Sequence, residues 1–184
     1  LKLSNVYGPT ENTTFTTHYP ICSEELVEKT PIGKPISNTT VHILNGHNLC
    51  GIGIPGELCV GGAGVARGYL NKAELTAEKF VVNPLVPEEK IYRTGDLARW
   101  LEDGNIEYLG RIDEQVKIRG FRIELGEIES KLREIPYIQD VAVTLIEKNN
   151  DKYLCGYVVS KQKIITEEIK NQLGKTLPQY MVPT

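Results

Sequence analysis

Residues 5–11, NVYGPTE, place a hydroxyl and a carboxylate directly after a rigid turn. Alternating apolar and polar residues, typical of a strand, lead into the turn at Gly8 and Pro9. Such a turn can fix the Thr10 hydroxyl toward a phosphate. Glu11 then supplies a hard oxygen ligand for Mg²⁺, which binds one or two carboxylates together with phosphate oxygens. Taken alone, the same residues also fit an ordinary β-turn with polar side chains.

An acidic residue follows a second turn in residues 92–97, YRTGDL. Asp96 comes directly after Thr94 and Gly95, at the start of a strand predicted over residues 96–101. A carboxylate in this place can accept hydrogen bonds from two adjacent hydroxyls, as a ribose presents them. A turn-capping aspartate is the alternative that this run leaves open when it is considered alone.

Basic residues gather in residues 110–129, GRIDEQVKIRGFRIELGEIE. Lys117 and Arg119 share one face of a predicted strand, because side chains alternate along a strand, and Arg122 follows closely. A basic strand edge that faces solvent discourages pairing with other chains. A strand edge that faces a phosphate is the functional alternative, and the pattern does not choose between them.

Two other groups of residues favour structural roles. Residues 56–69 are rich in glycine but lack the lysine–serine ending of a P-loop and the spacing of a dinucleotide fingerprint, so we expect tight turns there. His42, His47 and Cys50 lack a fourth donor, and we expect them in surface loops rather than around a metal ion.

Short β-type runs bounded by glycine and proline dominate the first two thirds of the chain, and their spacing suits a β-barrel or meander. One helix is predicted over residues 73–80, where Asn71 can cap the helix and Glu74 completes a capping box. The predicted strands, after an opening strand that ends at Tyr7, are residues 40–44, 57–60, 96–101, 106–109 and 115–118.

Near Asp113 the pattern changes to strand, helix, strand, strand and helix. We therefore predict a boundary at Asp113, with residues 1–113 as one unit and residues 114–184 as a small α+β unit. In the first of these helices, four apolar residues recur every three or four positions and form one stripe: Leu125, Ile128, Leu132 and Ile135.

Composition excludes several classes of protein. The 184 residues carry 21 lysines and arginines against 24 aspartates and glutamates, a net charge of −3 that lacks the basic excess of nucleic-acid-binding proteins. Apolar runs fall far short of the ~20 residues that cross a bilayer. The four cysteines are widely spaced, which favours a reducing, cytoplasmic setting. Because the chain opens inside a strand pattern, we expect a fragment with both neighbouring segments cut away.

Taken in order, these blocks resemble the adenylation domain of nonribosomal peptide synthetases, within the wider family of adenylate-forming enzymes. The resemblance covers nearly the whole chain, and several ordered blocks are far more specific than any one of them. The matching blocks are residues 5–11, 56–62, 66–70, 92–97, 110–129 and 177–183.

The resemblance implies the C-terminal portion of an adenylate-forming fold, mixed α+β. Residues 1–113 correspond to the strand-rich, β-barrel-like end of the large subdomain, with its nucleotide-binding motifs. Residues 114–184 correspond to the small mobile α+β subdomain, which stops before the stretch that carries the family's catalytic lysine. The phosphate loop and most of the amino-acid pocket are missing upstream, so we expect the isolated chain to be inactive in adenylation.

The resemblance also implies a reaction and its participants. The carboxylate of an amino acid attacks the α-phosphate of ATP, which gives an aminoacyl adenylate and pyrophosphate. The acyl group then passes to the phosphopantetheine thiol of a peptidyl carrier protein. ATP or AMP and Mg²⁺ are the implied cofactors, and neighbouring synthetase domains are implied partners, with no nucleic acid and no membrane.

Family positions assign roles to residues of the first block, residues 5–11, and of the fifth, residues 110–129. Asn5 and Tyr7 are expected to border the adenine, Thr10 to contact phosphate and Glu11 to hold Mg²⁺. Lys117 joins Thr10 and Glu11 as a catalytic candidate.

Further residues are assigned to the nucleoside and to the movement between half-reactions. Asp96 is expected to bind the ribose hydroxyls, with Tyr108 and Arg111 near the same nucleoside. Asp113 corresponds to the hinge about which the small subdomain turns. Gly120 is expected beside the channel for the pantetheine arm, where a side chain would obstruct the thiol.

Val6, Thr14 and Phe15 match positions that line the amino-acid pocket, and two of the three are apolar or aromatic, which disfavours a charged substrate side chain. Two alternatives stay open. One is a sister enzyme of the acyl-CoA synthetase type. The other is a non-catalytic nucleotide-binding or carrier-docking module.

Overall fold

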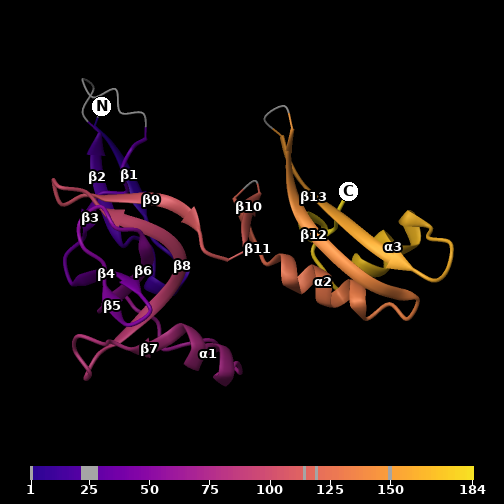
Figure 1. Ribbon diagram of the computed structural model, residues 1–184, viewed down its shortest axis with the longest axis horizontal. Coiled ribbons are helices and arrows are strands. Elements are labelled where there is room, and N and C mark those ends of the chain that lie inside the picture. Colours follow the sequence, from indigo (N-terminus) through magenta and orange to yellow (C-terminus); the bar gives the residue numbers. More distant parts are fainter. Residues whose placement is uncertain (1, 22–28, 114, 119, 149–150) are drawn as a thin grey trace. The chain divides into compact units, whose positions relative to one another are not determined.

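The computed structural model describes residues 2–21, 29–113, 115–118, 120–148 and 151–184. The chain divides into two compact units, Leu1–Asp113 and Glu114–Thr184. Strands are the main regular elements of the first unit, whereas two helices and a long hairpin are the main elements of the second (Figure 1). The strand-rich, mixed α+β class that the sequence predicts is confirmed.

A six-stranded antiparallel sheet forms the centre of the first unit, in the order β5-β4-β6-β8-β7, with β9 also paired to β8. Strand β8 pairs with β6, with β7 through its first residues and with β9 through its last residues. The strands are β4 (Thr39–Asn45), β5 (Asn48–Leu49), β6 (Gly56–Gly62), β7 (Phe80–Val82), β8 (Lys90–Trp100) and β9 (Ile106–Arg111).

Alternating apolar residues of these strands build the core of the first unit. Val41 and Ile43 of β4 pack with Leu58 and Val60 of β6, because every second residue of a strand points to the same face. Ile106 of β9 joins them and is fully buried. Burying one such side chain contributes about 1.5–3 kcal/mol, so this core holds β6, β8 and β9 in a fixed arrangement.

A smaller sheet carries the first sequence motif. Strands β1 (Leu3–Tyr7), β2 (Thr17–Ile21) and β3 (Lys34–Pro35) pair antiparallel in that order, and the 3-10 turn η1 (Thr10–Asn12) lies between the first two. The sequence analysis predicts β1 but neither β2 nor β3. Each of these two strands contains a proline, a residue that argues against a strand when the sequence is considered alone.

The second unit combines two hairpins with two helices. Helix α2 packs against β12 and buries the predicted apolar stripe, in a core that α3 completes. None of the helices in the described part of the chain is both long and apolar enough to cross a membrane. The elements are β10 (Val116–Ile118), β11 (Phe121–Ile123), α2 (Leu125–Arg133), β12 (Ile138–Lys148), β13 (Asp151–Ser160), α3 (Thr166–Leu173) and η2 (Gln179–Met181).

Strand β8 is longer than the sequence predicts. The turn expected at Thr94 and Gly95 lies inside one strand that continues from Lys90 to Trp100. Gly95 has a φ of +71°, and the strand accommodates it as a bulge instead of ending. The expectation of a turn was wrong because pairing with β6 on both sides of the glycine outweighs the local turn signal.

Two smaller expectations are also wrong. Helix α1 (Ala73–Lys79) has no capping box, since Lys72 is its N-cap and makes no side-chain capping bond. Asn71 adopts a positive φ of 55°, which asparagine tolerates, and so precedes the cap. His42 lies on β4 rather than in a surface loop, because the apolar residues on either side of it pair within the sheet.

His42 gives the first unit a pH-dependent stability. Its Nε2 atom is buried and has no hydrogen-bond partner among the described residues. Burial lowers the pKa of His42 below its ordinary 6.5, against the smaller, opposing effect of the Glu89 charge. The unfolded chain therefore binds more protons than the folded chain just below pH 6.5, and the free energy of unfolding falls as the pH falls through that range.

We predict that His42→Gln flattens this pH dependence. Urea unfolding of both chains at pH 7.5, 6.5 and 5.5, followed by the fluorescence of the single tryptophan, Trp100, measures the difference. Trp100 reports on the correct unit because it packs against the same core as β4. Parallel loss of stability in both chains on acidification would contradict the prediction.

Candidate functional site

A buried carboxylate joins the two sheets of the first unit. Asp96 of β8 accepts a hydrogen bond from the Tyr7 hydroxyl, at the end of β1, on Oδ2. It accepts a second bond, of 3.0 Å, from Arg111 Nη1 on Oδ1. Asp96 is 5% exposed. Since an ionised carboxylate accepts about four hydrogen bonds, these two leave capacity for a pair of ligand hydroxyls.

A bulge in β8 sets the direction of Asp96. Opposite the single residue Leu58 of β6, strand β8 has three residues, 94–96. Such bulges bend a strand and turn a side chain away from its regular direction, and they are common next to functional sites. Gly95 at the centre has the positive φ that glycine adopts without strain.

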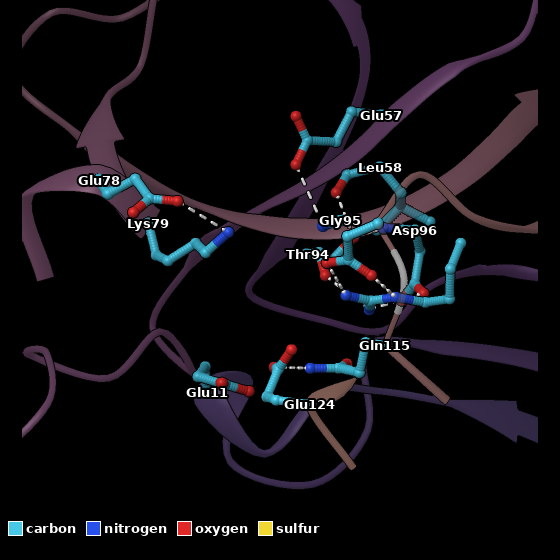
Figure 2. A network of polar contacts seen from close by, with 12 residues as sticks. Glu11, Glu57, Leu58, Glu78, Lys79, Thr94, Gly95, Asp96, Gln115 and Glu124 are labelled. Carbon is cyan, nitrogen blue, oxygen red and sulfur yellow. Dashed lines mark hydrogen bonds and ion pairs between the residues drawn. The ribbon is translucent and has the colours of Figure 1, made fainter. Parts of the chain in front are cut away.

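Hydrogen bonds satisfy the polar groups that the bulge removes from the strand ladder. Thr94 Oγ1 donates to the carbonyl oxygen of Leu58 at 2.6 Å and accepts the Asp96 N–H at 3.0 Å. The Gly95 carbonyl accepts the Ile112 N–H at 2.8 Å. Figure 2 shows Thr94, Gly95 and Asp96 grouped beside Leu58. The bulge is therefore a fixed part of the fold.

Arg111 donates hydrogen bonds to three residues. Besides Asp96, Nη1 donates to the Thr94 carbonyl oxygen at 2.8 Å, while Nε and Nη2 form a fork on the Asp113 carboxylate. Burial alone would lower the pKa of Arg111, but the bonds and charges of Asp113 and Asp96 outweigh it and raise the pKa. The guanidinium thus stays charged and links the predicted ribose residue to the predicted hinge residue.

Two tyrosines flank Asp96. Burial, followed by the charge of Asp96, raises the pKa of Tyr7, so its phenol remains protonated and can only donate to this carboxylate. The ring of Tyr108 lies 6.3 Å from that of Tyr7, tilted by 36°. Burial also raises the pKa of Tyr108, with Asp96 as the next cause. Because Tyr108 is partly exposed, its ring offers an aromatic surface to a planar base.

Glu11 is a second buried carboxylate. Tyr69 donates a 2.7 Å hydrogen bond to Glu11 Oε1, and burial, then Tyr92 and Glu11, raises the pKa of Tyr69. The described residues contain no group of three or more metal-ligating side chains. One carboxylate fits Mg²⁺ only if other oxygens, such as those of a phosphate, complete its shell. Glu11 follows Tyr7 by four residues, so the Cα atoms of these two residues lie at most about 14 Å apart.

The other residues of the first motif, residues 5–11, differ in exposure and in the contacts that they make. Asn5 Nδ2 donates to the Pro31 carbonyl oxygen at 2.8 Å and so holds β1 in place. Thr10 is exposed at the start of η1. A Cβ at Gly8 would lie 2.4 Å from the Thr14 carbonyl oxygen, so this position requires glycine. The close approach of the Thr14 backbone therefore accounts for the glycine at this position.

The predicted pocket residues lie partly together. Thr14 and Phe15 line one depression of about 350 Å³, together with Asn12 and Ile36. Val6 is not among its lining residues, although its side chain is exposed, as is that of Phe15.

Two predicted residues belong to the second unit. Gly120 occupies the turn between β10 and β11 with a φ of +83°, and a Cβ there would meet no other atom within 4 Å. Lys117 is on β10, but its side chain lies outside the described part of the structure, as does Arg119.

Sequence reasoning missed two positions that shape the site. Glu57 bonds to the Gly95 N–H, and Tyr69 bonds to Glu11. Both stand in residues 56–69, whose glycines suggested tight turns and where a strand is predicted only over residues 57–60. A carboxylate at the first residue of that predicted strand was the available signal for Glu57.

Gly95→Ala tests how tightly the bulge is coupled to Arg111. A Cβ at this position would lie 2.7 Å from both Arg111 Nη2 and Asp113 Oδ2, at a φ that L residues avoid. We expect a loss of roughly 1–3 kcal/mol in the free energy of unfolding, measured with urea. Gly110→Ala is the control, because Gly110 has a φ of +125° with nothing within 4 Å. Equal losses in both variants would contradict the coupling.

Two family models and several known proteins match this chain in sequence. The family model described as "AMP-binding enzyme" matches residues 1–70, and the model described as "AMP-binding enzyme C-terminal domain" matches residues 127–184. Tyrocidine synthase 3 of Brevibacillus parabrevis is 59% identical over the whole chain, and gramicidin S synthase 2 of Brevibacillus brevis is 55% identical. The chain spans only 3% and 4% of those two proteins.

A solved structure agrees with these matches. PA1221, an NRPS protein containing adenylation and PCP domains, superposes with a TM-score of 0.81 at 38% identity. The match covers 100% of this chain and 37% of that one. The chain belongs to the AMP-binding enzyme family, and within that family it is similar to the adenylation domains of nonribosomal peptide synthetases.

Proposed function

We propose that this chain is part of an amino-acid-activating ligase. It binds the nucleoside of ATP and contains the start of the mobile subdomain. The arrangement of Tyr7, Asp96 and Arg111 carries the proposal. It is a buried carboxylate with spare acceptor capacity, oriented by two donors and flanked by the partly exposed aromatic ring of Tyr108. Vicinal hydroxyls and a planar base are the groups that such a site matches.

In the first half-reaction, an oxygen of the amino-acid carboxylate attacks the α-phosphorus of ATP and pyrophosphate leaves. Asp96 binds the ribose hydroxyls, with Asn5, Tyr7 and Tyr108 beside the adenine. Arg111 keeps the carboxylate oriented. Positioning and charge neutralisation are the main demands of this chemistry, and a preformed hydrogen-bonded site meets the first of them.

Thr10 and Glu11 follow Asn5 and Tyr7 along the chain and face the phosphate groups in this proposal. Glu11 would hold Mg²⁺, and the ion, when bound, neutralises charge on the phosphate oxygens. The Thr10 hydroxyl would bind a phosphate oxygen. Lys117 is the basic residue of the second unit that we assign to the same reaction.

In the second half-reaction, the phosphopantetheine thiol of a peptidyl carrier protein attacks the acyl carbon and AMP leaves. Asp113 is the hinge in this proposal, at the boundary between the two compact units. Gly120, with free space at its Cα, would lie beside the pantetheine arm. The presence of adenylation and PCP domains together in PA1221 supports a carrier protein and neighbouring synthetase domains as partners.

The amino-acid substrate contacts Val6, Thr14 and Phe15 in this proposal, and their side chains favour an uncharged substrate. High identity to two peptide synthetases favours an amino acid over the fatty acid of an acyl-CoA synthetase. Free thiols at Cys50, Cys59 and Cys155 support a reducing, cytoplasmic setting.

Asp96→Ala is expected to remove most of the AMP affinity of this chain. Loss of charge-assisted bonds to two ribose hydroxyls should raise the dissociation constant roughly 10- to 100-fold in a calorimetric titration. Asp103→Ala is the matched control, because it removes the same charge from an exposed turn. No AMP binding to the unaltered chain would contradict the proposed nucleoside site.

We also predict that the isolated chain does not catalyse amino-acid-dependent ATP–pyrophosphate exchange. Charge develops at the α-phosphate during the reaction, and the family's phosphate loop and catalytic lysine stretch are not among these 184 residues. A complete adenylation domain assayed in parallel is the control. Exchange near the rate of that domain would refute the prediction.

A further inference from the structure

The bulge that directs Asp96 is held by a side chain from the neighbouring strand. Glu57 of β6 is partly buried, with 12% of its side chain exposed. Its Oε1 accepts the N–H of Gly95, at the centre of the bulge, at 3.0 Å. Its Oε2 accepts two bonds from Arg93, from Nε at 2.9 Å and from Nη2 at 2.5 Å. One carboxylate thus binds Arg93, the residue before the bulge, and Gly95, the residue at its centre. Figure 2 shows the contact between Glu57 and Gly95.

We propose that Glu57 is a positioning residue of the nucleotide site, which acts on ribose through Gly95 and Asp96. The inference rests on the proposed function, because it assigns the purpose of the bulge to the ribose contact. Glu57 itself touches only protein groups among the bonds described for it.

The geometry explains why a carboxylate is required. In the ladder, the Gly95 N–H would face β6, but the bulge separates it from any carbonyl there, so it needs a side-chain acceptor. Arg93 fixes one oxygen of Glu57 by a two-donor contact, which leaves the other oxygen aimed at Gly95. A glutamine would present either its amide NH₂ to the guanidinium or its NH₂ to the Gly95 N–H, and both are donor–donor contacts.

The position of the bulge then determines where the Asp96 carboxylate lies. Thr94 is fixed by Leu58, the Asp96 N–H by Thr94 and the Gly95 carbonyl by Ile112, so the bond from Glu57 is what holds the N–H of the Gly95 peptide. Releasing that peptide allows the backbone of Asp96 to rotate. Its carboxylate then leaves the orientation that Tyr7 and Arg111 define, and two adjacent hydroxyls lose their acceptor.

A second cross-strand ion pair in this chain serves as a matched control for the Arg93–Glu57 pair. Arg99 of β8 binds Glu107 of β9 at 2.7 Å, and the two side chains are 39% and 15% exposed. The Arg93–Glu57 pair is 46% and 12% exposed. Both pairs link an arginine of β8 to a glutamate on a neighbouring strand, but Arg99 and Glu107 lie directly opposite each other, after the register shift between Leu97 and Ala98.

The experiment compares Glu57→Gln with Glu107→Gln in the full 184-residue chain. Titrations use two probes, AMP and 2′,3′-dideoxy-AMP, which lacks the hydroxyls that Asp96 would bind. Amide hydrogen exchange at Gly95 and the side-chain carboxyl ¹³C shift of Asp96, both by NMR, report on the bulge without any nucleotide.

For Glu57→Gln we expect at least about tenfold faster exchange at Gly95, a changed Asp96 carboxyl shift, and about tenfold weaker AMP binding. Binding of 2′,3′-dideoxy-AMP should change less than about twofold, as should every measurement on Glu107→Gln. Equal weakening of both nucleotides, or Gly95 exchange and an Asp96 shift like those of Glu107→Gln, would overturn the role of Glu57.

Absence of AMP binding to the unaltered chain would count against the proposed function alone. In that case the amide exchange at Gly95 and the carboxyl shift of Asp96 still decide whether Glu57 fixes the orientation of the Asp96 carboxylate. Unchanged values of both in Glu57→Gln would refute the positioning role, and changed values would support it.

Discussion

The hydrogen bonds that converge on the Asp96 carboxylate are the constraint on which the first unit depends. They join β1 of the small sheet to β8 and β9 of the large sheet, through Tyr7 and Arg111. A buried carboxylate is costly unless it is paired and bonded, so the fold must supply these donors wherever it supplies the acid. The same pairing makes the carboxylate a preorganised acceptor, which is the property a sugar-binding site requires.

The candidate residues of the site could be named from the sequence, whereas the contacts that join them in the fold could not. The motifs identify Glu11, Asp96 and Arg111 as candidates, and the apolar stripe predicts α2. Tyr7 and Asp96 are 89 residues apart, so their contact depends on how two sheets pack. The bulge at Gly95 was also out of reach, because a Thr-Gly pair is a turn signal until the partner strand is known.

The supporting residues show how a sheet accommodates a bulge. Thr94 and Glu57 replace the ladder bonds that the bulge breaks, and neither would be singled out by its type. Arg111 extends the arrangement to Asp113, the last residue of the first unit. A chain of polar contacts therefore runs from Glu57, near the start of β6, to the boundary between the units, without leaving the first unit.

The Arg111 fork also gives the site a polarity. One guanidinium lies between two carboxylates, those of Asp96 and Asp113, so the immediate group carries more negative than positive charge. A neutral hydroxyl meets no charge repulsion beside such a group, whereas an anionic phosphate is repelled from it. A nucleotide would consequently enter with its sugar toward Asp96 and its phosphates directed elsewhere, and this electrostatic bias alone would reject the reversed orientation.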